Sequence, residues 1–279
     1  MDLWGFASAG IAVPAIILVI GVRQGTLKPV SAIGAGLVTA GVTYLCGWQW
    51  GMALDAYLLG VVAWIPFRRH TKAEACDRPG GLALLAPAAL LAPLAWPALI
   101  AVAEAALGGA EVAFVLFLGS LAASSADLWA SEIGVLNSQA PRDLVRGKQQ
   151  PAGAAGAVSP LGLVAATAGG WAIGLAGMGA RLLPALIAGR PASSQWGLLP
   201  LICTCAGLMG SVADSILGGI AQAIYHCPRC ERATDQPIHH CGTPTLKVRG
   251  WHHLTNHRVD LIASMVGGVV ALVFWMWLA

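Results

Sequence analysis

The sequence has little charge. Only 10% of its 279 residues are Asp, Glu, Lys or Arg, whereas a soluble domain carries about 25%. Hydrophobic residues make up 57%, and the mean hydropathy is +0.72. This composition excludes a water-soluble globular domain, and with it collagen-like, coiled-coil, disordered and disulfide-scaffold chains. The apolar runs are continuous rather than alternating, which argues against a transmembrane β-barrel.

Long apolar runs recur along the whole chain instead. Each approaches the roughly 20 residues that a helix needs to cross a bilayer. The eight runs are Leu3–Val22, Val30–Cys46, Trp50–Phe67, Leu82–Val102, Val112–Gly134, Leu161–Gly179, Trp196–Tyr225 and Leu261–Leu278. They predict an all-α, polytopic membrane bundle of about eight helices in one transmembrane domain over residues 1–279. The seventh run is long enough to be tilted, or broken near Gly207–Gly210.

The charges alternate between the two sides of this predicted bundle. The connections after the first, third, fifth and seventh runs hold 14 of the 16 basic residues and all seven histidines. Arg181 and Arg190 fall on the other side, where Glu104 and Glu111 also lie. Basic loops stay in the cytoplasm. We therefore expect a multi-pass protein of the plasma or inner cell membrane, with functional loops in the cytoplasm and both termini outside. No transit peptide precedes the first run.

Five carboxylates lie within or at the ends of the apolar runs: Asp55, Asp127, Glu132, Asp214 and Asp260. An ionisable group in hydrocarbon is costly and faces the interior of the bundle. Small polar residues spaced three or four positions apart accompany them, an arrangement that can also serve only to join helices. Carboxylates on three separate helices favour a shared site. Asp55 lacks polar neighbours and is interpreted as interfacial.

Two of these carboxylates end similar strings. LAASSAD (Leu121–Asp127) and LMGSVAD (Leu208–Asp214) share the pattern L-x-x-S-x-A-D. Membrane folds often contain internal repeats whose equivalent helices surround one site. The pattern therefore suggests an internal repeat.

The connection Ala140–Ser159 combines basic residues with glycines. Arg142, Arg146 and Lys148 precede Gly153 and Gly156, and an apolar run follows. Phosphate binding needs cations and close backbone N–H groups at a helix start. The loop is not a Walker A motif, because its lysine precedes the glycines. The alternative is a basic loop that meets anionic lipid head groups.

Carboxylates beside a phosphate-binding loop indicate Mg²⁺, which proteins hold by one or two carboxylates together with phosphate oxygens. We expect Asp127, Asp214 and Asp260 to be its ligands, supported by Glu132 and Asn256. Phosphoryl transfer needs little more than positioning and charge neutralisation.

A Cys/His segment lies between the last two runs, in a small cytoplasmic insert over residues 226–250. Its C-x-x-C pair, Cys227 and Cys230, is followed by His239, His240 and Cys241. Three cysteines and one histidine make a closed, tetrahedral zinc site. We expect Cys227, Cys230, His240 and Cys241 to hold structural zinc. The alternative is free thiols, since disulfides are rare in the cytoplasm.

Four motifs occur in a characteristic order. They are SSADLWASEIGVL (Ser124–Leu136), RGKQQPAGAAGAVSPLG (Arg146–Gly162), GSVADSILGG (Gly210–Gly219) and TNHRVDLIAS (Thr255–Ser264). With GTLKPVSAIGAGLV (Gly25–Val38), they resemble the integral membrane family called domain of unknown function 92, or the transmembrane protein 19 family. That family includes the plant phytyl-phosphate kinase.

The resemblance implies a magnesium-dependent kinase that uses a nucleoside triphosphate to convert an isoprenoid monophosphate, such as phytyl or geranylgeranyl phosphate, to the diphosphate. The positions that match the family's polar and glycine positions are Asp127, Glu132, Gly153, Gly156, Asp214, Ser215 and Asn256. The chain departs from the family's loop pattern P-G-T-x-G-G-V-S, because the threonine and one glycine are alanines here. Asp260 stands where the family usually has an asparagine.

These observations give the site hypothesis. The catalytic residues are Asp127, Glu132, Asp214 and Lys148. The phosphate- and nucleotide-binding residues are Arg78, Arg142, Arg146, Lys148, Gly153, Gly156, Ser159, Ser215 and Asn256. The expected partners are a prenyl-phosphate lipid, a nucleoside triphosphate and the bilayer, with no nucleic acid. Two alternatives stay open: a carrier of prenyl phosphates or ions, and a lipid-phosphate cytidylyltransferase.

Overall fold

The computed structural model describes residues 3–75, 87–108, 111–189, 191 and 193–278. This part of the chain is mostly helical, which confirms the all-α prediction. Its helices are α1 (Leu3–Arg23), α2 (Pro29–Cys46), α3 (Trp48–Trp64), α4 (Arg69–Ala75), α5 (Pro87–Leu107), α6 (Glu111–Gly134), α7 (Pro160–Ile187), α8 (Leu199–Ile220) and α9 (Asn256–Leu278), with a 3-10 turn, η1, at Ser194–Leu198.

Most of these helices are long and apolar enough to cross a bilayer. Within the described residues six meet that requirement, and a seventh does if α3 and α4, bent by 72° at their junction, count as one span. The remaining predicted run corresponds to α1, whose apolar stretch over Ile11–Arg23 is shorter. The arrangement is consistent with the eight predicted crossings.

The structure differs from the prediction for the seventh run in three ways. The run begins with η1, and the helix α8 then continues without a break through Gly207 and Gly210 to Ile220. The predicted break is absent because both glycines pack closely against α6: a Cβ on Gly210 would overlap the Cβ of Ala123. Tyr225, expected in the helix, belongs to a β-strand.

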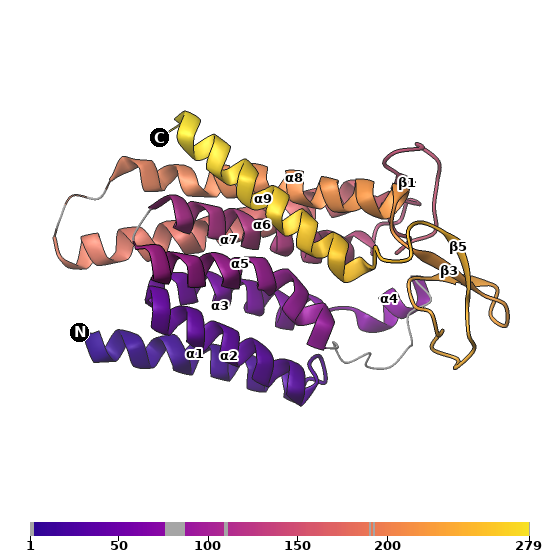
Figure 1. Cartoon of the computed structure of the whole chain (residues 1–279), viewed down its shortest axis with the longest axis horizontal. Helices are drawn as coiled ribbons and strands as arrows, with labels where there is room; N and C mark the ends of the chain where they lie inside the picture. The colour runs from indigo at the N-terminus through magenta and orange to yellow at the C-terminus, as the bar shows by residue number, and fades with distance from the viewer. Residues whose placement is uncertain (1–2, 76–86, 109–110, 190, 192, 279) are drawn as a thin grey trace.

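The helices run up and down along one long axis (Figure 1). The helix α6 lies at the centre of the C-terminal half, where it packs against α7, α8 and α9. The helices α1, α2, α3 and α5 form a second group beside it. Both termini lie at one end of the bundle, and the β-strands and α4 lie at the other.

Small residues bring the central helices close together. A Cβ on Gly119 of α6 would lie 2.6 Å from the carbonyl oxygen of Gly267 on α9. The Ser264 hydroxyl donates a hydrogen bond to the Ser120 carbonyl, at 3.3 Å, between the same helices. Such contacts hold helices together in lipid, where water supplies no hydrophobic force between them. By contrast, Leu37 and Val164 are 70% and 67% exposed on the outside of the bundle.

Two small sheets lie at the end opposite the termini. In the loop between α6 and α7, β1 (Arg142–Asp143) pairs antiparallel with β2 (Ala157–Val158). In the connection before α9, β3 (Ile224–Cys227) lies between β4 (Arg232–Thr234) and β5 (Leu246–Arg249), again antiparallel.

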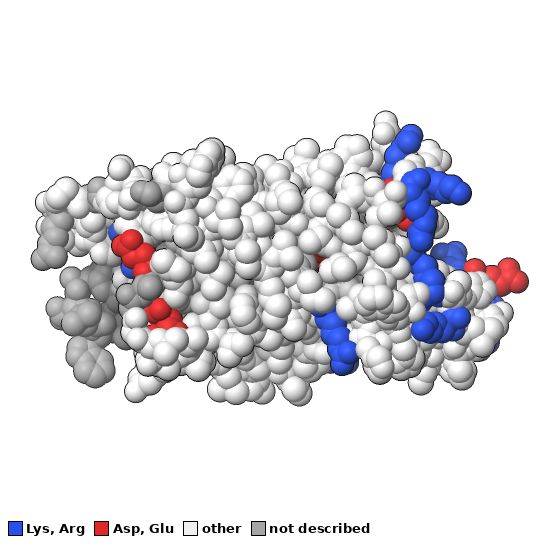
Figure 2. Space-filling model, turned by 45° about the horizontal axis from the view of Figure 1, so that its top comes forward, with Lys and Arg blue, Asp and Glu red and all other residues white. Residues whose placement is uncertain are grey.

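Lysine and arginine side chains gather at this sheet-bearing end (Figure 2). Acidic side chains are visible at the opposite end, beside a small patch of basic ones. The alternating basic connections of the sequence therefore meet at one end of the bundle. Which side of a membrane that end faces stays a prediction.

Candidate functional site

Three carboxylates from three helices meet near the sheet-bearing end of the bundle. Asp127 of α6, Asp214 of α8 and Asp260 of α9 each offer an oxygen, and these oxygens lie within 4.8 Å of one another. All three residues are partly buried. The packing of α6 against both α8 and α9 creates this cluster from segments far apart in the sequence. Like charges so close repel one another, so the cluster favours a bound cation.

One oxygen of the cluster is buried and unpaired. Asp214 Oδ2 has no hydrogen-bond partner among the described residues. A buried acceptor without a partner is costly, and a metal ion would satisfy it. Oxygen-only donors suit Mg²⁺, Ca²⁺ or Mn²⁺ and not the softer metals. The three aspartates therefore fit the magnesium ion that the sequence suggested.

Two amide side chains orient Asp260. Asn256, one turn earlier on α9, donates from Nδ2 to both carboxylate oxygens at 3.2 Å. Gln222 Nε2 in turn donates to Asn256 Oδ1 at 3.2 Å. His257 Nδ1 lies 3.9 Å from Asp260 Oδ2, too far for a hydrogen bond. The chain of amides fixes the direction in which Asp260 presents its oxygens.

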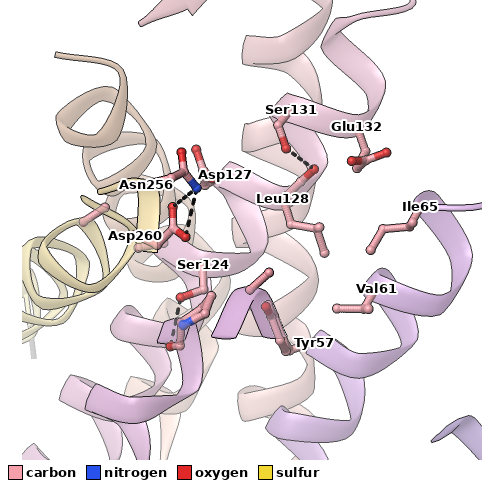
Figure 3. Close-up of a pocket in the computed structure, with 14 residues that line it drawn as sticks. Tyr57, Val61, Ile65, Ser124, Asp127, Leu128, Ser131, Glu132, Asn256 and Asp260 are labelled. Carbon is pink, nitrogen blue, oxygen red and sulfur yellow. Dashed lines mark hydrogen bonds between the residues drawn. The ribbon is translucent and has the colours of Figure 1, made fainter. Parts of the chain in front are cut away.

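A cavity of about 160 Å³ adjoins the cluster, lined by α3, α5, α6 and α9 (Figure 3). Asp127, Asn256 and Asp260 lie on one side of it, and Tyr57 and Val61 contribute to its wall. Pockets for drug-sized ligands measure about 300–1,000 Å³. This cavity therefore has room for a small charged group and not for a long apolar chain.

Glu132 lies away from the aspartates, on the other side of the cavity (Figure 3). Its Oε2 forms an ion pair with Lys72 Nζ at 2.7 Å, and both residues are buried. Lys72 also donates to the Trp64 carbonyl at 2.5 Å. The sequence grouped Glu132 with the metal ligands, but the structure gives it a partner on α4 instead.

Ser159 differs from its predicted role as a phosphate ligand. It is the N-cap of α7: its Oγ accepts a hydrogen bond from the Gly162 N–H at 3.1 Å and donates to the Gly134 carbonyl at 3.0 Å. Pro160 follows as the first helical residue. Serine before proline is a common helix start, so the hydroxyl serves the backbone.

The loop between β1 and β2 is closed by Asp143. Its Oδ1 accepts the N–H groups of Val145 and Arg146 at 2.9 and 2.8 Å, and its Oδ2 lies 3.2 Å from Arg146 Nη1. These bonds, led by the Arg146 N–H, lower the pKa of Asp143 below its usual value. The loop therefore has a fixed turn at its basic segment.

Two arginines attach this loop to the end of α8. Arg146 Nη1 donates to the Gly219 carbonyl at 3.3 Å, and Arg249 of β5 donates to the same oxygen. Arg249 also lies 3.4 Å from the Ala155 carbonyl. Cations are favourable at a helix C-terminus. Both arginines thus hold the glycine-containing part of the loop beside α8.

Gly156 touches the helix directly. Its φ is +81°, and a Cβ there would lie 2.5 Å from the Gly219 Cα and 2.8 Å from the Ser215 carbonyl oxygen. Only glycine fits such an approach at that φ. The structure thus brings Gly156 beside Ser215, one residue after Asp214.

Among the described residues, the remaining predicted phosphate ligands are absent from the cavity lining. Arg142 and Lys148 are exposed on the loop, and Gly153, with a φ of +78°, lies in the same loop. The Arg146 side chain is 49% exposed, so it has a free face as well as its loop contacts. Arg78 lies outside the described residues.

A second cluster lies in the three-stranded sheet. One donor atom each from Cys227, Cys230, His239 and Cys241 lies within 4.8 Å of the others. The histidine is His239, not the predicted His240: His239 is buried and places Nδ1 3.2 Å from Cys241 Sγ, whereas His240 is exposed. Hydrogen bonds from Thr243 and then His239 lower the pKa of Cys241 below that of a free thiol, which favours the charged form that binds metals.

The site hypothesis of the sequence lacks Tyr57, Lys72, Gln222, His239 and Arg249. Gln222 lies just past the end of α8, at helical spacing from the polar residues of that helix. Its spacing could therefore have identified it from the sequence. Lys72 is buried whereas Arg68 and Arg69 of the same connection are exposed, and the residue types give no sign of this difference. Arg249 likewise resembles its exposed neighbours in sequence.

The fold defines a polytopic integral membrane protein, with a cluster of three aspartates between its helices. The chain belongs to the family described as Integral membrane protein DUF92, which it matches over residues 12–268. That match covers all three aspartates, the loop between β1 and β2, and the Cys/His cluster.

Two relatives show how widely the similarity extends. Protein PGR of Arabidopsis thaliana is 33% identical over 149 residues, which are 53% of this chain and 50% of PGR; the match thus spans about half of that relative's length. An uncharacterized membrane protein of Methanocaldococcus jannaschii is 24% identical over 245 residues, 87% of this chain and 83% of the relative. No solved structure matches the chain.

Proposed function

We propose that this protein is a membrane-embedded kinase that phosphorylates an isoprenoid monophosphate, such as phytyl or geranylgeranyl phosphate, with a nucleoside triphosphate as donor. One observation carries the proposal: Asp127, Asp214 and Asp260 offer oxygens within 4.8 Å of one another, beside a small cavity. The resemblance of the sequence motifs to the family of the plant phytyl-phosphate kinase gives the substrate class.

The aspartates would hold magnesium, with Asn256 and Gln222 keeping Asp260 in position. When bound, the ion would neutralise phosphate charge. The chain's own residues bind and orient the two anionic substrates. The size of the cavity, about 160 Å³, supports entry of the phosphate head group while the prenyl chain stays between helices or in lipid.

The reaction balances without a general base. A phosphate-monoester oxygen of the prenyl phosphate attacks the terminal phosphorus of the nucleotide, and the bond from that phosphorus to the bridging oxygen breaks. The products are the prenyl diphosphate and the nucleoside diphosphate, with the same total charge as the reactants. The acceptor is already an anion and needs no deprotonation. The carboxylates of the site therefore do not have to act as bases and can bind a cation. Positioning and charge neutralisation then supply the catalysis.

The basic loop is the proposed nucleotide contact. Arg142, Lys148 and the free face of Arg146 are exposed at the sheet-bearing end, and Gly156 brings the loop to the end of α8, five residues past Asp214. Exposed cations attract polyanionic nucleotides. In this proposal that end faces the cytoplasm, where nucleoside triphosphates are available.

The test is product formation by the purified full-length protein in detergent, with Mg²⁺, labelled phytyl or geranylgeranyl phosphate, and ATP, CTP, GTP and UTP separately. We expect prenyl diphosphate with at least one donor, and its loss by more than about 100-fold in Asp127→Asn and Asp214→Asn, as for groups that stabilise transition-state charge. Asp55→Asn is the matched control, because Asp55 is also buried in a helix but lies outside the cluster.

Three outcomes would overturn the proposal. A CDP-linked lipid with release of diphosphate would identify a cytidylyltransferase. Tight binding of the lipid phosphate without product from any donor would favour a carrier. Equal loss of activity in Asp55→Asn and Asp127→Asn would show that the aspartate cluster has no special role.

A further inference from the structure

The sheet formed by β3, β4 and β5 has almost no core of its own. Each strand has only three or four residues, and most of their side chains are exposed or half-buried. Ile238, Leu246 and Val248 are 63%, 65% and 66% exposed. A module this small buries too little apolar surface to be ordered without a cross-link or a metal.

Four metal-binding side chains come together from the end of β3 and from the turns that connect the strands of this sheet. We propose that Cys227, Cys230, His239 and Cys241 hold one structural zinc ion, which fixes the sheet and, through β5, the basic loop against the end of α8. The donor atoms lie within 4.8 Å of one another. This site is separate from the aspartate cluster, and its test does not depend on kinase activity.

The distances match tetrahedral zinc. Two sulfurs at Zn–S bonds of about 2.3 Å and tetrahedral angles lie about 3.8 Å apart. Cys227 Sγ and Cys241 Sγ are 3.7 Å apart, far beyond the roughly 2.05 Å of a disulfide. Three sulfurs and one imidazole nitrogen form a full set of four ligands. No position is left open for substrate, so the ion is structural.

Two turns present the four ligands. In the first, between β3 and β4, the Glu231 N–H donates to the Cys227 carbonyl at 2.9 Å, so the chain folds back around Cys230. In the second, the Gly242 N–H donates to the His239 carbonyl at 2.8 Å, and Gly242 has a φ of +80°. Each turn contributes two ligands, and the metal would join the turns.

The sheet is attached to the helical bundle on its other side. Arg249 at the end of β5 donates to the Gly219 carbonyl and contacts the Ala155 carbonyl of the basic loop. The Trp251 N–H donates to the Ala221 carbonyl at 2.8 Å, just past α8. A sheet fixed by zinc would therefore keep Arg249 at the junction of the loop and α8.

The first measurement is the metal content of the full-length protein purified in detergent without chelators. We expect about one zinc per chain, and all cysteines of the cluster unreactive toward a thiol reagent until the metal is removed. Less than about 0.1 zinc per chain with freely reactive thiols, a disulfide among these cysteines, or bound iron instead of zinc would overturn the proposal.

Two adjacent histidines supply a matched pair of variants. His239 is buried in the cluster, and His240 is exposed with its ring 3.9 Å from that of His239. His239→Ala should lose zinc to a chelator more than about 10-fold faster than the wild type, and His240→Ala at nearly the wild-type rate. Equal rates for the two variants would refute the assignment. His239→Ala keeps all three cysteines of the cluster. The comparison therefore needs no variant that lacks two ligands, such as Cys227→Ser/Cys230→Ser, to be folded.

Limited proteolysis tests the structural role. Arg229, Arg232 and Lys247 are exposed trypsin sites in the sheet region. Removing zinc should raise cleavage there by more than about 10-fold, and adding zinc back should restore protection, because ordering this module depends on the metal. Cleavage that is unchanged by zinc removal would overturn the role in fixing the sheet.

Discussion

Asn256 donates hydrogen bonds from one amide nitrogen to both carboxylate oxygens of Asp260, at 3.2 Å each. Both residues lie on α9, one turn apart, and Gln222 fixes the Asn256 amide from the end of α8. The residue that completes the three-aspartate cluster is therefore oriented by a polar chain that links two helices. An orienting partner of this kind affects metal affinity without contacting the metal.

We predict that Asn256→Ala weakens binding of a divalent ion at the aspartate cluster by about 10–100-fold, the usual effect of losing such a partner. Binding of Mn²⁺, as a spectroscopic substitute for Mg²⁺, measures this by electron paramagnetic resonance in detergent. Asn137→Ala is the control, because Asn137 is a half-buried amide outside the cluster whose side chain bonds locally to the Gln139 carbonyl. Unchanged Mn²⁺ affinity in Asn256→Ala would contradict the orienting role.

Gly156 and Gly147 provide a second matched pair. Both have a positive φ, +81° and +68°, but only at Gly156 would an added Cβ have neighbours within 4 Å. Gly147→Ala should destabilise the fold by about 1–2 kcal/mol through its φ alone. Gly156→Ala should have the same cost for its φ and should destabilise the fold by about 1–3 kcal/mol more, because its Cβ would clash with Gly219.

Thermal unfolding of both glycine variants in the same detergent measures this difference. The larger fall in Tm should belong to Gly156→Ala, together with weaker nucleotide binding if the loop moves away from α8. Equal falls in Tm would mean that the close approach of Gly156 to α8 contributes nothing to stability.

The buried ion pair between Lys72 and Glu132 gives a prediction about stability. Removing one partner leaves an uncompensated buried charge, so Lys72→Met and Glu132→Gln should each cost about 3–5 kcal/mol. The double variant Lys72→Met/Glu132→Gln removes both charges and should cost less than the sum of the two single changes. Glu74→Gln, at an exposed position of the same short helix, should have almost no effect.

A thermal double-mutant cycle, with activity measured on each variant, distinguishes this structural role from the catalytic role predicted for Glu132. If the pair only joins α4 to α6, the double variant should keep both its fold and its activity. A stable double variant without activity would restore Glu132 to the catalytic set.

The sequence predicted the parts of this architecture that follow from the cost of transferring groups into lipid. Apolar runs indicated the helices because a backbone in hydrocarbon must satisfy its own hydrogen bonds. Asp127, Asp214 and Asp260 could be grouped because a carboxylate within an apolar run is expensive. The structure brings those three together.

The remaining assignments depended on geometry that residue types do not encode. Lys72 and Glu132 are 60 positions apart, and each resembles an ordinary charge near a helix end. His239 and His240 are neighbours, and only the turn closed by the bond from the Gly242 N–H to the His239 carbonyl selects which one faces the cysteines. For Ser159 a signal was present, since serine before proline marks a helix start, but the basic loop favoured a phosphate interpretation.

Asp143 gives a pH-dependent prediction. Its pKa is lowered, chiefly by the Arg146 N–H and also by the Val145 N–H, relative to the unfolded value of about 3.9. A group with a lowered pKa in the folded state stabilises the fold above its unfolded pKa, and this contribution is lost as the pH falls through the folded pKa. Asp143→Asn removes a charge that closes the loop between β1 and β2, so the variant should be less stable than the wild type at neutral pH.

The difference in Tm between the wild type and Asp143→Asn should be constant above about pH 5 and shrink below about pH 4, where Asp143 of the unfolded wild-type chain begins to be protonated while the folded chain keeps the carboxylate charged. Asp235→Asn, a change at an exposed carboxylate of the three-stranded sheet region, serves as the control for the loss of one acidic side chain. Melting curves in one detergent between about pH 3 and pH 8 measure both variants. A difference in Tm that stays unchanged at the acid end of this range would contradict the prediction. It would mean that Asn destabilises the loop for steric reasons and that the charge of Asp143 does not hold the loop.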